Sequence, residues 1–541
     1  MVKSRVNISN DVRVNKNGKR KLNKNKNHVY EYEGYNSDLS ETEEFMEEYA
    51  EQTDDDDFDA PSYIFPGLVI SSKKSNYILI YNLDGGNNGC VWLSYCIDDK
   101  KYFIIKVQDF DCYKGGVVEK KILQYIKNRA NEDSHVVELL DYFLYTVEEV
   151  STDDDKKKYH FMCTVYEVYA GSLLYLITNG KYKYGLPIDI VKDITKQLLK
   201  SLRFLHDDLH VLHTDIKPAN ILFEGIHPFT EKLIESFEGT NFDIRYSDIL
   251  AKGKYTKTSL ADKLQDLARK CVKAVFKTMH LGETDEVSDD EEFSDDEDFC
   301  DDEKNAEEEN DEEENDDLSP KRLNRREQSV EDLSTVFMDN EIVDVDRNYD
   351  WDEVLNNSAA SKDKVNVVDE EYVKNCKIAL ADFGSSTRFD DRPKDEIQDR
   401  DFRAPEVVLD MPYDFAVDIW SVGCVVFQLL TGFILFEFKH NDLNKDLNTL
   451  YMFEKILGPI PLEMKKNCVR SRFLFDEERN HHIRNIKEFK HTSMKDILIK
   501  QYLFSEKDAD EICEFILPTL NYMPSDRPTA EQLLNHKWLN N

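Results

Sequence analysis

The chain has 541 residues, and its 109 acidic residues outnumber its 70 Lys and Arg residues, which gives a formal net charge of −39. The negative charge is concentrated in residues 36–59 and 283–316, so it describes tails and inserts more than a folded core. An acidic protein gains no free energy by releasing the counterions of a phosphate backbone, and we therefore expect no direct binding to nucleic acid. Basic proteins are the better matched partners.

The ten cysteines are scattered without a CxxC pair, which argues against a zinc site or a disulfide framework. We therefore expect a reducing intracellular compartment: the cytoplasm, the nucleus, or a host cell if the source is a virus. The N-terminus lacks the apolar core of a signal peptide, and the most apolar run, residues 422–436, is too short to span a bilayer. This run predicts a buried helix, and we expect no membrane association.

Composition and periodicity divide the chain into five parts. Residues 1–61 are polar and charged and cannot repay the entropy of ordering, so we expect a disordered tail. Residues 62–166 contain short β-rich runs joined by turns, together with one segment of helical spacing at 116–128, and they predict a small antiparallel sheet with one helix. Residues 167–225 and 377–541 have helical periodicity and predict a larger second lobe. The fold class is therefore α+β, with two lobes.

The fifth part, residues 226–376, interrupts the helical lobe. It begins with mixed composition and then runs into a long acidic tract, so we expect it to be largely disordered. One amphipathic segment places Leu260, Leu264, Leu267, Cys271 and Val275 at helical intervals. We expect this segment to form one helix that docks on the folded domain.

The segment at 211–220, VLHTDIKPAN, carries the first chemical signal. A carboxylate that accepts a proton from a hydroxyl group needs a metal-binding amide beside it, and the spacing of Asp215 and Asn220 places both at one cleft. Lys217 would then stand near a transferred phosphate. Taken alone, this spacing is better explained as a loop with solvated polar residues.

A second signal is Asp382-Phe383-Gly384, which follows a hydrophobic strand. Mg²⁺ prefers carboxylate oxygen, and glycine lets the backbone turn away from the metal. The triplet is common by chance, but its position between the Asp215 loop and Ala404-Pro405-Glu406 is not. The ordered set predicts a site for ATP and Mg²⁺.

Lys106, in the strand FIIKV, and Glu119, in the helical segment that follows, form a third signal. Lys106 would hold the α- and β-phosphates of ATP, and Glu119 would orient it through an ion pair. The alternative is an exposed strand lysine and a surface glutamate. The other motifs favour the functional interpretation.

The fourth signal is the hairpin at 84–91, DGGNNGCV. Glycines let backbone N–H groups approach phosphate oxygens closely. Against the pattern G-x-G-x-x-G-x-V, Gly86, Gly89 and Val91 match, whereas Asp84 replaces the first glycine. Alone, this segment is equally well explained as a simple turn.

Together these residues resemble the SR protein kinases, with some features nearer the cdc-like kinases. The stretches that carry the resemblance are GCVWLSY, HTDIKPAN, IQDRDFRAPEV, DIWSVGC and LTGFILFE. Thr214 stands where most kinases have arginine, and this form is typical of the group, as is a long insert before DFG. The resemblance implies a two-lobed kinase fold, with a β-rich N-lobe and a helical C-lobe split by the acidic insert. It also implies a monomer that transfers the γ-phosphate of ATP to Ser and Thr hydroxyls of proteins, including Arg/Ser-rich ones.

The resemblance assigns further roles by position. Tyr166 would be the gatekeeper, and the Glu167 carbonyl and the Tyr169 amide would bind adenine. Other roles concern the lower lobe: Asp418 would brace the catalytic loop, Glu406 and Arg527 would form a buried ion pair, and Arg400 and Arg403 would shape the substrate loop. The expected site residues are therefore Asp215 and Lys217 for catalysis, Asn220 and Asp382 for the metal, and Gly86, Gly89, Val91, Lys106, Glu119, Glu167 and Tyr169 for ATP.

Some positions depart from the family pattern. Ile104 replaces an alanine that usually touches adenine, and Asp399 replaces a threonine that bridges the catalytic aspartate and lysine. A carboxylate at 399 would either repel Asp215 or pair with Lys217, and the sequence leaves both open. Of the acidic docking residues of SR protein kinases, only Asp442 and Asp446 remain. The alternative function is a catalytically weak, pseudokinase-like scaffold that binds basic partners.

Overall fold

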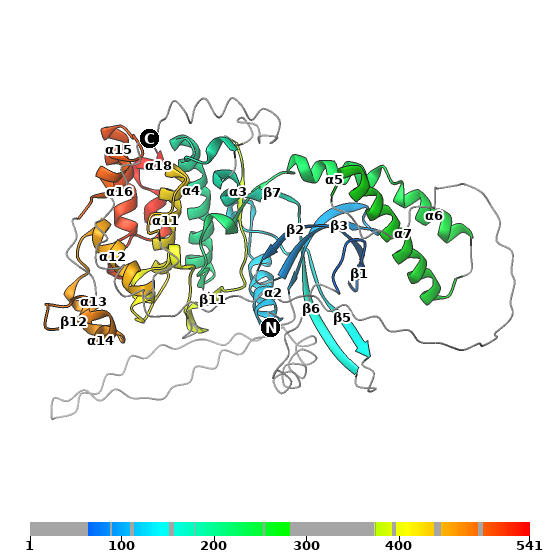
Figure 1. Cartoon of the computed structure of the whole chain (residues 1–541), viewed down its shortest axis with the longest axis horizontal. Helices are drawn as coiled ribbons and strands as arrows, with labels where there is room; N and C mark the ends of the chain where they lie inside the picture. The colour runs from blue at the N-terminus through cyan, green and yellow to red at the C-terminus, as the bar shows by residue number, and fades with distance from the viewer. Residues whose placement is uncertain are drawn as a thin grey trace, which may run out of the picture. The chain divides into compact units, whose positions relative to one another are not determined.

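The computed structural model describes residues 63–540, with gaps at 87–88, 109–112, 151–155, 179, 253–254, 282–372, 374, 392–395, 438–444 and 485–490 (Figure 1). The tail expected at 1–61 and the acidic tract at 283–316 lie outside these residues. Their predicted disorder, and the domain boundaries drawn from it, remain predictions.

The N-lobe contains the expected antiparallel sheet, with six strands in the order β1-β2-β3-β4-β6-β5. Short turns connect β1 to β2 and β3 to β4, and helix α2 (Tyr113–Lys127) follows β4. The strands are β1 (Val69–Ser71), β2 (Asn76–Gly86), β3 (Gly89–Cys96), β4 (Lys101–Gln108), β5 (Asp141–Val150) and β6 (Lys156–Tyr166).

β5 and β6 pair as a long antiparallel hairpin, in a register that runs from Asp141 opposite Val165 to Val150 opposite Lys156. Residues 151–155, between the two strands, lie outside the described residues.

Both faces of the sheet are buried. Ile78, Leu79 and Ile80 are consecutive in β2 and all have 0% exposure. Because successive side chains of a strand point to opposite faces, apolar partners must lie on both sides. Leu79 packs with Phe103 and Phe143 on one face.

Helices of the insert cover the other face. They are α5 (Pro228–Glu238), α6 (Phe242–Lys252) and α7 (Lys257–Met279), drawn in green beside β1, β2 and β3 in Figure 1. The expected amphipathic helix is α7, and its Leu264, Leu267, Ala268, Cys271 and Val275 join Ile78, Ile80 and Leu93 in one apolar cluster.

Two helices more than expected therefore precede the acidic tract. Helix α5 contributes Leu233 and Phe237 to the cluster. Polar contacts also fix the insert: the Gln265 amide donates to the Gly67 carbonyl (2.6 Å) and accepts from the Val69 N–H (3.0 Å). Within residues 226–376, α7 was expected, whereas the helices α5 and α6 were not.

The C-lobe is built around α11 (Ala416–Thr431), whose side chains are buried from Val417 to Thr431, as the apolar run predicted. Within the described ranges, no helix is both long and apolar enough to cross a bilayer. The other helices of this lobe are α3 (Leu173–Thr178), α4 (Ile188–Arg203), α10 (Pro405–Val408), α12 (Lys445–Leu457), α13 (Leu462–Asn467), α14 (Ser471–Leu474), α15 (Met494–Lys500), α16 (Glu506–Thr519), α17 (Ala530–Leu534) and α18 (Lys537–Asn540).

Short strands line the junction between the lobes. They are β7 (Tyr169–Ser172), β9 (Ile221–Glu224) and β10 (Ile378–Leu380) in one sheet, and β8 (Val211–Leu212) paired with β11 (Thr387–Arg388). A further pair, β12 (Phe475–Asp476) and β13 (His482–Ile483), lies near α14. The loop between β8 and β9 and the loop that follows β10 carry the site.

The docking of α7 gives a testable expectation. Val275 is fully buried against the sheet, so Val275→Asp places an unpaired carboxylate in an apolar contact. We expect a cost of about 2–4 kcal/mol and a melting temperature lower by about 5 °C or more. Thermal unfolding followed by circular dichroism measures this, with Lys273→Asp on the exposed face of α7 as the matched control. Equal shifts in the two variants would contradict the packing described here.

Candidate active site

A buried carboxylate holds the backbone of the loop that carries Asp215. Asp418, on α11, has 0% exposure and accepts hydrogen bonds from the backbone N–H of His213 (2.9 Å) and of Thr214 (2.8 Å). Burial raises the pKa of Asp418, but the contact with His206 at 2.9 Å outweighs it, and the net shift is downward. Asp418 therefore braces the loop as an anion, as the resemblance implied.

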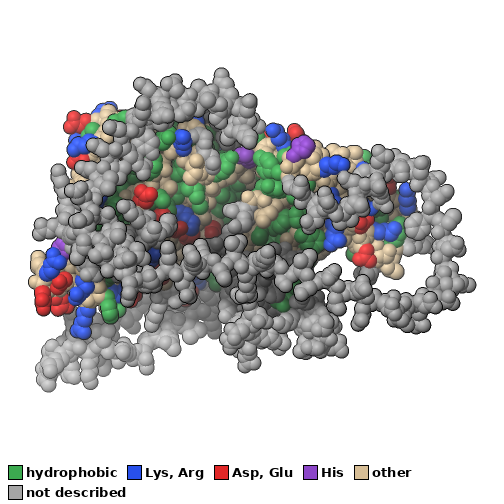
Figure 2. Space-filling view, viewed as in Figure 1, with side chains coloured by type: hydrophobic (Ala, Val, Ile, Leu, Met, Phe, Trp, Pro, Cys, Tyr) green, Lys and Arg blue, Asp and Glu red, His purple; other side chains and the backbone are tan. Residues whose placement is uncertain are grey.

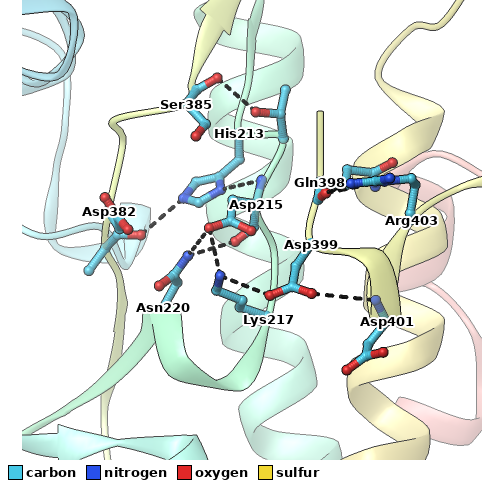
Figure 3. A network of polar contacts seen from close by, with 12 residues as sticks. His213, Asp215, Lys217, Asn220, Asp382, Ser385, Gln398, Asp399, Asp401 and Arg403 are labelled. Carbon is cyan, nitrogen blue, oxygen red and sulfur yellow. Dashed lines mark hydrogen bonds and ion pairs between the residues drawn. The ribbon is translucent and has the colours of Figure 1, made fainter. Parts of the chain in front are cut away.

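The loop brings Asp215, Lys217 and Asn220 together (Figure 3). The side-chain amide of Asn220 donates to the Asp215 carbonyl (2.9 Å) and to Asp215 Oδ2 (2.8 Å). The Lys217 ammonium lies 3.1 Å from the same Oδ2. Both of these side chains therefore contact the same carboxylate oxygen of Asp215.

Lys106, Glu119 and Asp382 meet in a three-residue ion-pair cluster. Lys106 Nζ, on β4, lies 3.0 Å from Glu119 Oε2, on α2, and 2.8 Å from Asp382 Oδ1, which follows β10. Burial lowers the pKa of Lys106, but the two carboxylates raise it further, and the net shift is upward. Burial likewise raises the pKa of Asp382, whereas Lys106 lowers it to a net value below the ordinary one. Asp382 is therefore an anion at neutral pH.

Two further side chains contact Glu119, and Gln108 is the one that was not predicted. Gln108 donates to Glu119 Oε2 (2.6 Å), and the hydroxyl of Tyr166, the expected gatekeeper, donates to Glu119 Oε1 (3.4 Å). Gln108 lies two positions after Lys106 on the same strand, so both side chains face the same side. This alternation was visible in the sequence and would have identified Gln108.

In the hairpin at 84–91, the backbone geometry explains why residue 89 is a glycine. Gly89 has φ +129, and a Cβ there would lie 2.2 Å from the Val107 carbonyl oxygen of the neighbouring strand. Gly86 pairs with Gly89 at the end of the hairpin, and Val91 lies opposite Lys106 in the sheet register. The phosphate contacts expected of Gly86, Gly89 and Val91 remain predictions.

The predicted adenine-binding residues lie where the lobes join. Glu167 and Tyr169 follow the end of β6, and Tyr169 pairs with Glu224 at the start of β7. Ile104 lies opposite Tyr166 in the register of β4 and β6. Their contacts with adenine remain predictions.

The segment after Asp382 is anchored by charged and amide side chains. Arg527 donates two hydrogen bonds of 2.7 Å to the two carboxylate oxygens of Glu406, and both side chains are almost fully buried. Gln398, also buried, donates to Ser421 Oγ (2.8 Å) and to the Val417 carbonyl (3.0 Å) on α11. Arg403 donates to the Gln398 carbonyl (2.7 Å). These contacts fix residues 398–406 to the C-lobe.

Asp399 and Asp446 each have basic partners in the structure. Asp399 Oδ2 lies 3.2 Å from Lys217 Nζ, so the carboxylate pairs with the lysine. Asp446 lies between Arg400 and Arg470, at 2.7 Å from each. Asp442 lies outside the described residues.

A β-rich lobe and a helical lobe, with a Lys–Glu–Asp cluster facing an Asp–Asn loop between them, define the class of protein kinases. The protein kinase domain family matches residues 77–234 and 366–539, and the chain belongs to this family. The two matched segments flank the insert, which confirms the predicted fold class and its interruption.

Individual relatives narrow the class to serine/threonine kinases. The protein L205 of Acanthamoeba polyphaga mimivirus, named as a serine/threonine-protein kinase, is 39% identical over 523 residues, which cover 94% of this chain and 92% of that protein. SKY1 of Saccharomyces cerevisiae is 26% identical, with 86% of this chain and 74% of SKY1 covered. Human SRSF protein kinase 3 is 25% identical, with 91% and 90% covered. The protein is thus a serine/threonine kinase, and the predicted relation to SR protein kinases is confirmed.

We predict that this kinase needs no phosphate on the segment between Gly384 and Ala404. In many kinases an arginine before the catalytic aspartate pairs with a phosphorylated residue of that segment. Here Thr214 is buried and donates to the Ser385 carbonyl (2.7 Å), and Ser386 donates to the His213 carbonyl (3.1 Å). Uncharged contacts therefore already hold the start of the segment.

Bacterially produced protein treated with phosphatase should keep about half or more of its initial rate. The rate is measured before mass spectrometry detects autophosphorylation. A lag abolished by pre-incubation with ATP, together with a mapped phosphate between residues 385 and 403, would refute this prediction.

Proposed function

We propose that the protein uses Mg²⁺ and ATP to phosphorylate Ser and Thr hydroxyls, with Asp215 as the acceptor of the hydroxyl proton. The observation that carries the proposal is the joint presence of the Lys106–Glu119–Asp382 cluster and the Asp215–Asn220 contact. Phosphoryl transfer depends on positioning and on charge stabilisation, which these groups supply. Lys217 lies beside Asp215, where it would stabilise the transferred phosphate.

The residues assigned to the metal fit a hard cation. Asp382 supplies carboxylate oxygen, and the nitrogen of the Asn220 amide is already engaged with Asp215, which leaves the amide oxygen as the ligand atom. Bound Mg²⁺ would neutralise charge on the phosphates. Asp382 and Asn220 come from the two loops that flank the cleft, after β10 and before β9.

For ATP we propose the binding roles that the motifs and the family resemblance assign. Lys106 would hold the α- and β-phosphates. Glu119 would orient the Lys106 ammonium, which lies 3.0 Å from Glu119 Oε2. Backbone N–H groups at Gly86 and Gly89 would cover the phosphates, with Val91 below the adenine. The Glu167 carbonyl and the Tyr169 N–H would bind the adenine edge.

For substrates we propose basic, Arg/Ser-rich proteins. The support is the strongly acidic composition of the chain and the relation to SRSF protein kinase 3. On the face seen in Figure 2, acidic and basic side chains of the described residues are interspersed. Asp446, the described acidic docking position, is engaged by Arg400 and Arg470. A basic substrate would have to displace one of these arginines.

We also propose that the kinase acts inside cells, as a monomer and without direct contact to nucleic acid. Among the described residues, free thiols occur at Cys96, Cys163, Cys271, Cys376, Cys424, Cys468 and Cys513, which agrees with a reducing compartment. Gel filtration with light scattering would test the monomer.

The decisive test of the proposed function is Asp382→Asn. The change keeps the shape of the side chain but removes the charge that would hold the metal, so transfer should fall on the order of 10²-fold or more. The assay is transfer of labelled phosphate to an Arg/Ser repeat peptide, with Asp410→Asn on the exposed surface as control. Full activity in Asp382→Asn would exclude the proposed mechanism.

A Glu/Ser repeat peptide of equal length tests the substrate class. Equal rates for the two peptides would exclude the proposed preference for basic substrates. Such a result would leave the kinase activity itself unaffected.

A further inference from the structure

The ammonium of Lys217 lies between two carboxylates from distant parts of the chain. Its Nζ is 3.1 Å from Asp215 Oδ2 and 3.2 Å from Asp399 Oδ2 (Figure 3). Burial lowers the pKa of Lys217, but the two carboxylates raise it further, so the lysine is a cation. One positive charge is therefore shared by the loop that carries the base and the loop that faces the substrate.

Asp399 projects from a backbone that is fixed on both sides. The preceding residue, Gln398, is buried and bonded to α11 through Ser421 and Val417. The following residue, Arg400, donates to Asp446 on α12 (2.7 Å). Asp399 also caps the short turn Arg400–Phe402, because its Oδ1 accepts from the Asp401 N–H (3.4 Å).

Lysine is a flexible side chain, and holding it in one place costs rotamer entropy. Asp215 alone would leave the ammonium free to swing around a single carboxylate. A second carboxylate on an anchored backbone restricts the ammonium to positions within hydrogen-bonding distance of both loops. The contact with Asp399 also limits how closely the Lys217 ammonium can approach the Asp215 carboxylate.

We propose that Asp399 is a positioning residue, which acts on phosphoryl transfer by holding the Lys217 ammonium beside Asp215. The inference rests on the proposed function, because Lys217 acts on the transferred phosphate. Asp399 itself touches neither ATP nor the reacting hydroxyl in this scheme. Its carboxylate supplies the second fixed point that places Lys217 for the phosphate.

Asp399→Asn removes the ion pair with Lys217 but keeps the cap of the turn Arg400–Phe402. Asparagine keeps the oxygen that accepts from the Asp401 N–H, and it is as good a capping residue as aspartate. We expect kcat to fall about tenfold, while KM for the peptide changes by less than about threefold, because a transition-state contact is lost and a binding contact is not. Asp401→Asn, which removes a negative charge from the same loop, should change kcat by less than about twofold.

The second arm repeats Asp399→Asn in a Lys217→Met background. Single-turnover transfer with labelled ATP and excess enzyme makes slow reactions measurable. If Asp399 acts through Lys217, the tenfold effect should shrink to less than about twofold, since coupled residues are non-additive. Melting temperatures within about 2 °C of each parent would show that folding is intact.

Two outcomes would overturn the inference. One is an unchanged kcat in Asp399→Asn, and the other is the same loss with and without Lys217. A wild-type protein that transfers no phosphate would refute the proposed function instead, so the two failures are distinguishable.

Discussion

The arrangement of the two lobes depends on the ion pairs that the Lys106 ammonium makes. The ammonium reaches from the N-lobe sheet to Glu119 on α2 and to Asp382 of the C-lobe. Removing a charge from water is costly, and the cost is offset only when partners are close and well oriented. Here Glu119 and Asp382 meet that condition for Lys106, and the Gln108 amide donates to Glu119. The positions of helix α2, the N-lobe sheet and the loop that carries Asp382 are thereby coupled at one point.

The C-lobe supplies the fixed frame against which this contact works. Asp418 holds the backbone of the catalytic loop, and the Glu406–Arg527 pair holds the end of the segment that faces substrates. Both carboxylates are buried and fully paired, so replacing either partner would leave an uncompensated charge. Between the two anchors lie Asp215, Lys217 and Asp399. Precision at the reacting groups thus comes from buried charges that do no chemistry themselves.

The sequence revealed much of the site because catalytic chemistry needs particular residue types at particular spacings. Lys106, Glu119, Asp215, Asn220 and Asp382 were all identified from motifs, and the structure brings them together. The partner of Asp399 could not be predicted, because whether it repels Asp215 or pairs with Lys217 depends on a distance between loops 182 positions apart. The helices α5 and α6 were missed for another reason. Each has 11 residues, and helices this short gain most of their stability from tertiary packing rather than from local sequence.

The first helices of the insert also alter how the two lobes are connected. The chain leaves β9, in the C-lobe, at Glu224 and begins α5, which packs on the N-lobe, at Pro228. Three intervening residues reach at most about 10 Å when extended. Val168, in the connection between β6 and β7, packs against the same cluster as these helices. The lobes are thus joined by two short tethers side by side, and a hinge with two tethers rotates through a smaller arc than a hinge with one. Exchange of a nucleotide between the lobes must occur within that restricted opening.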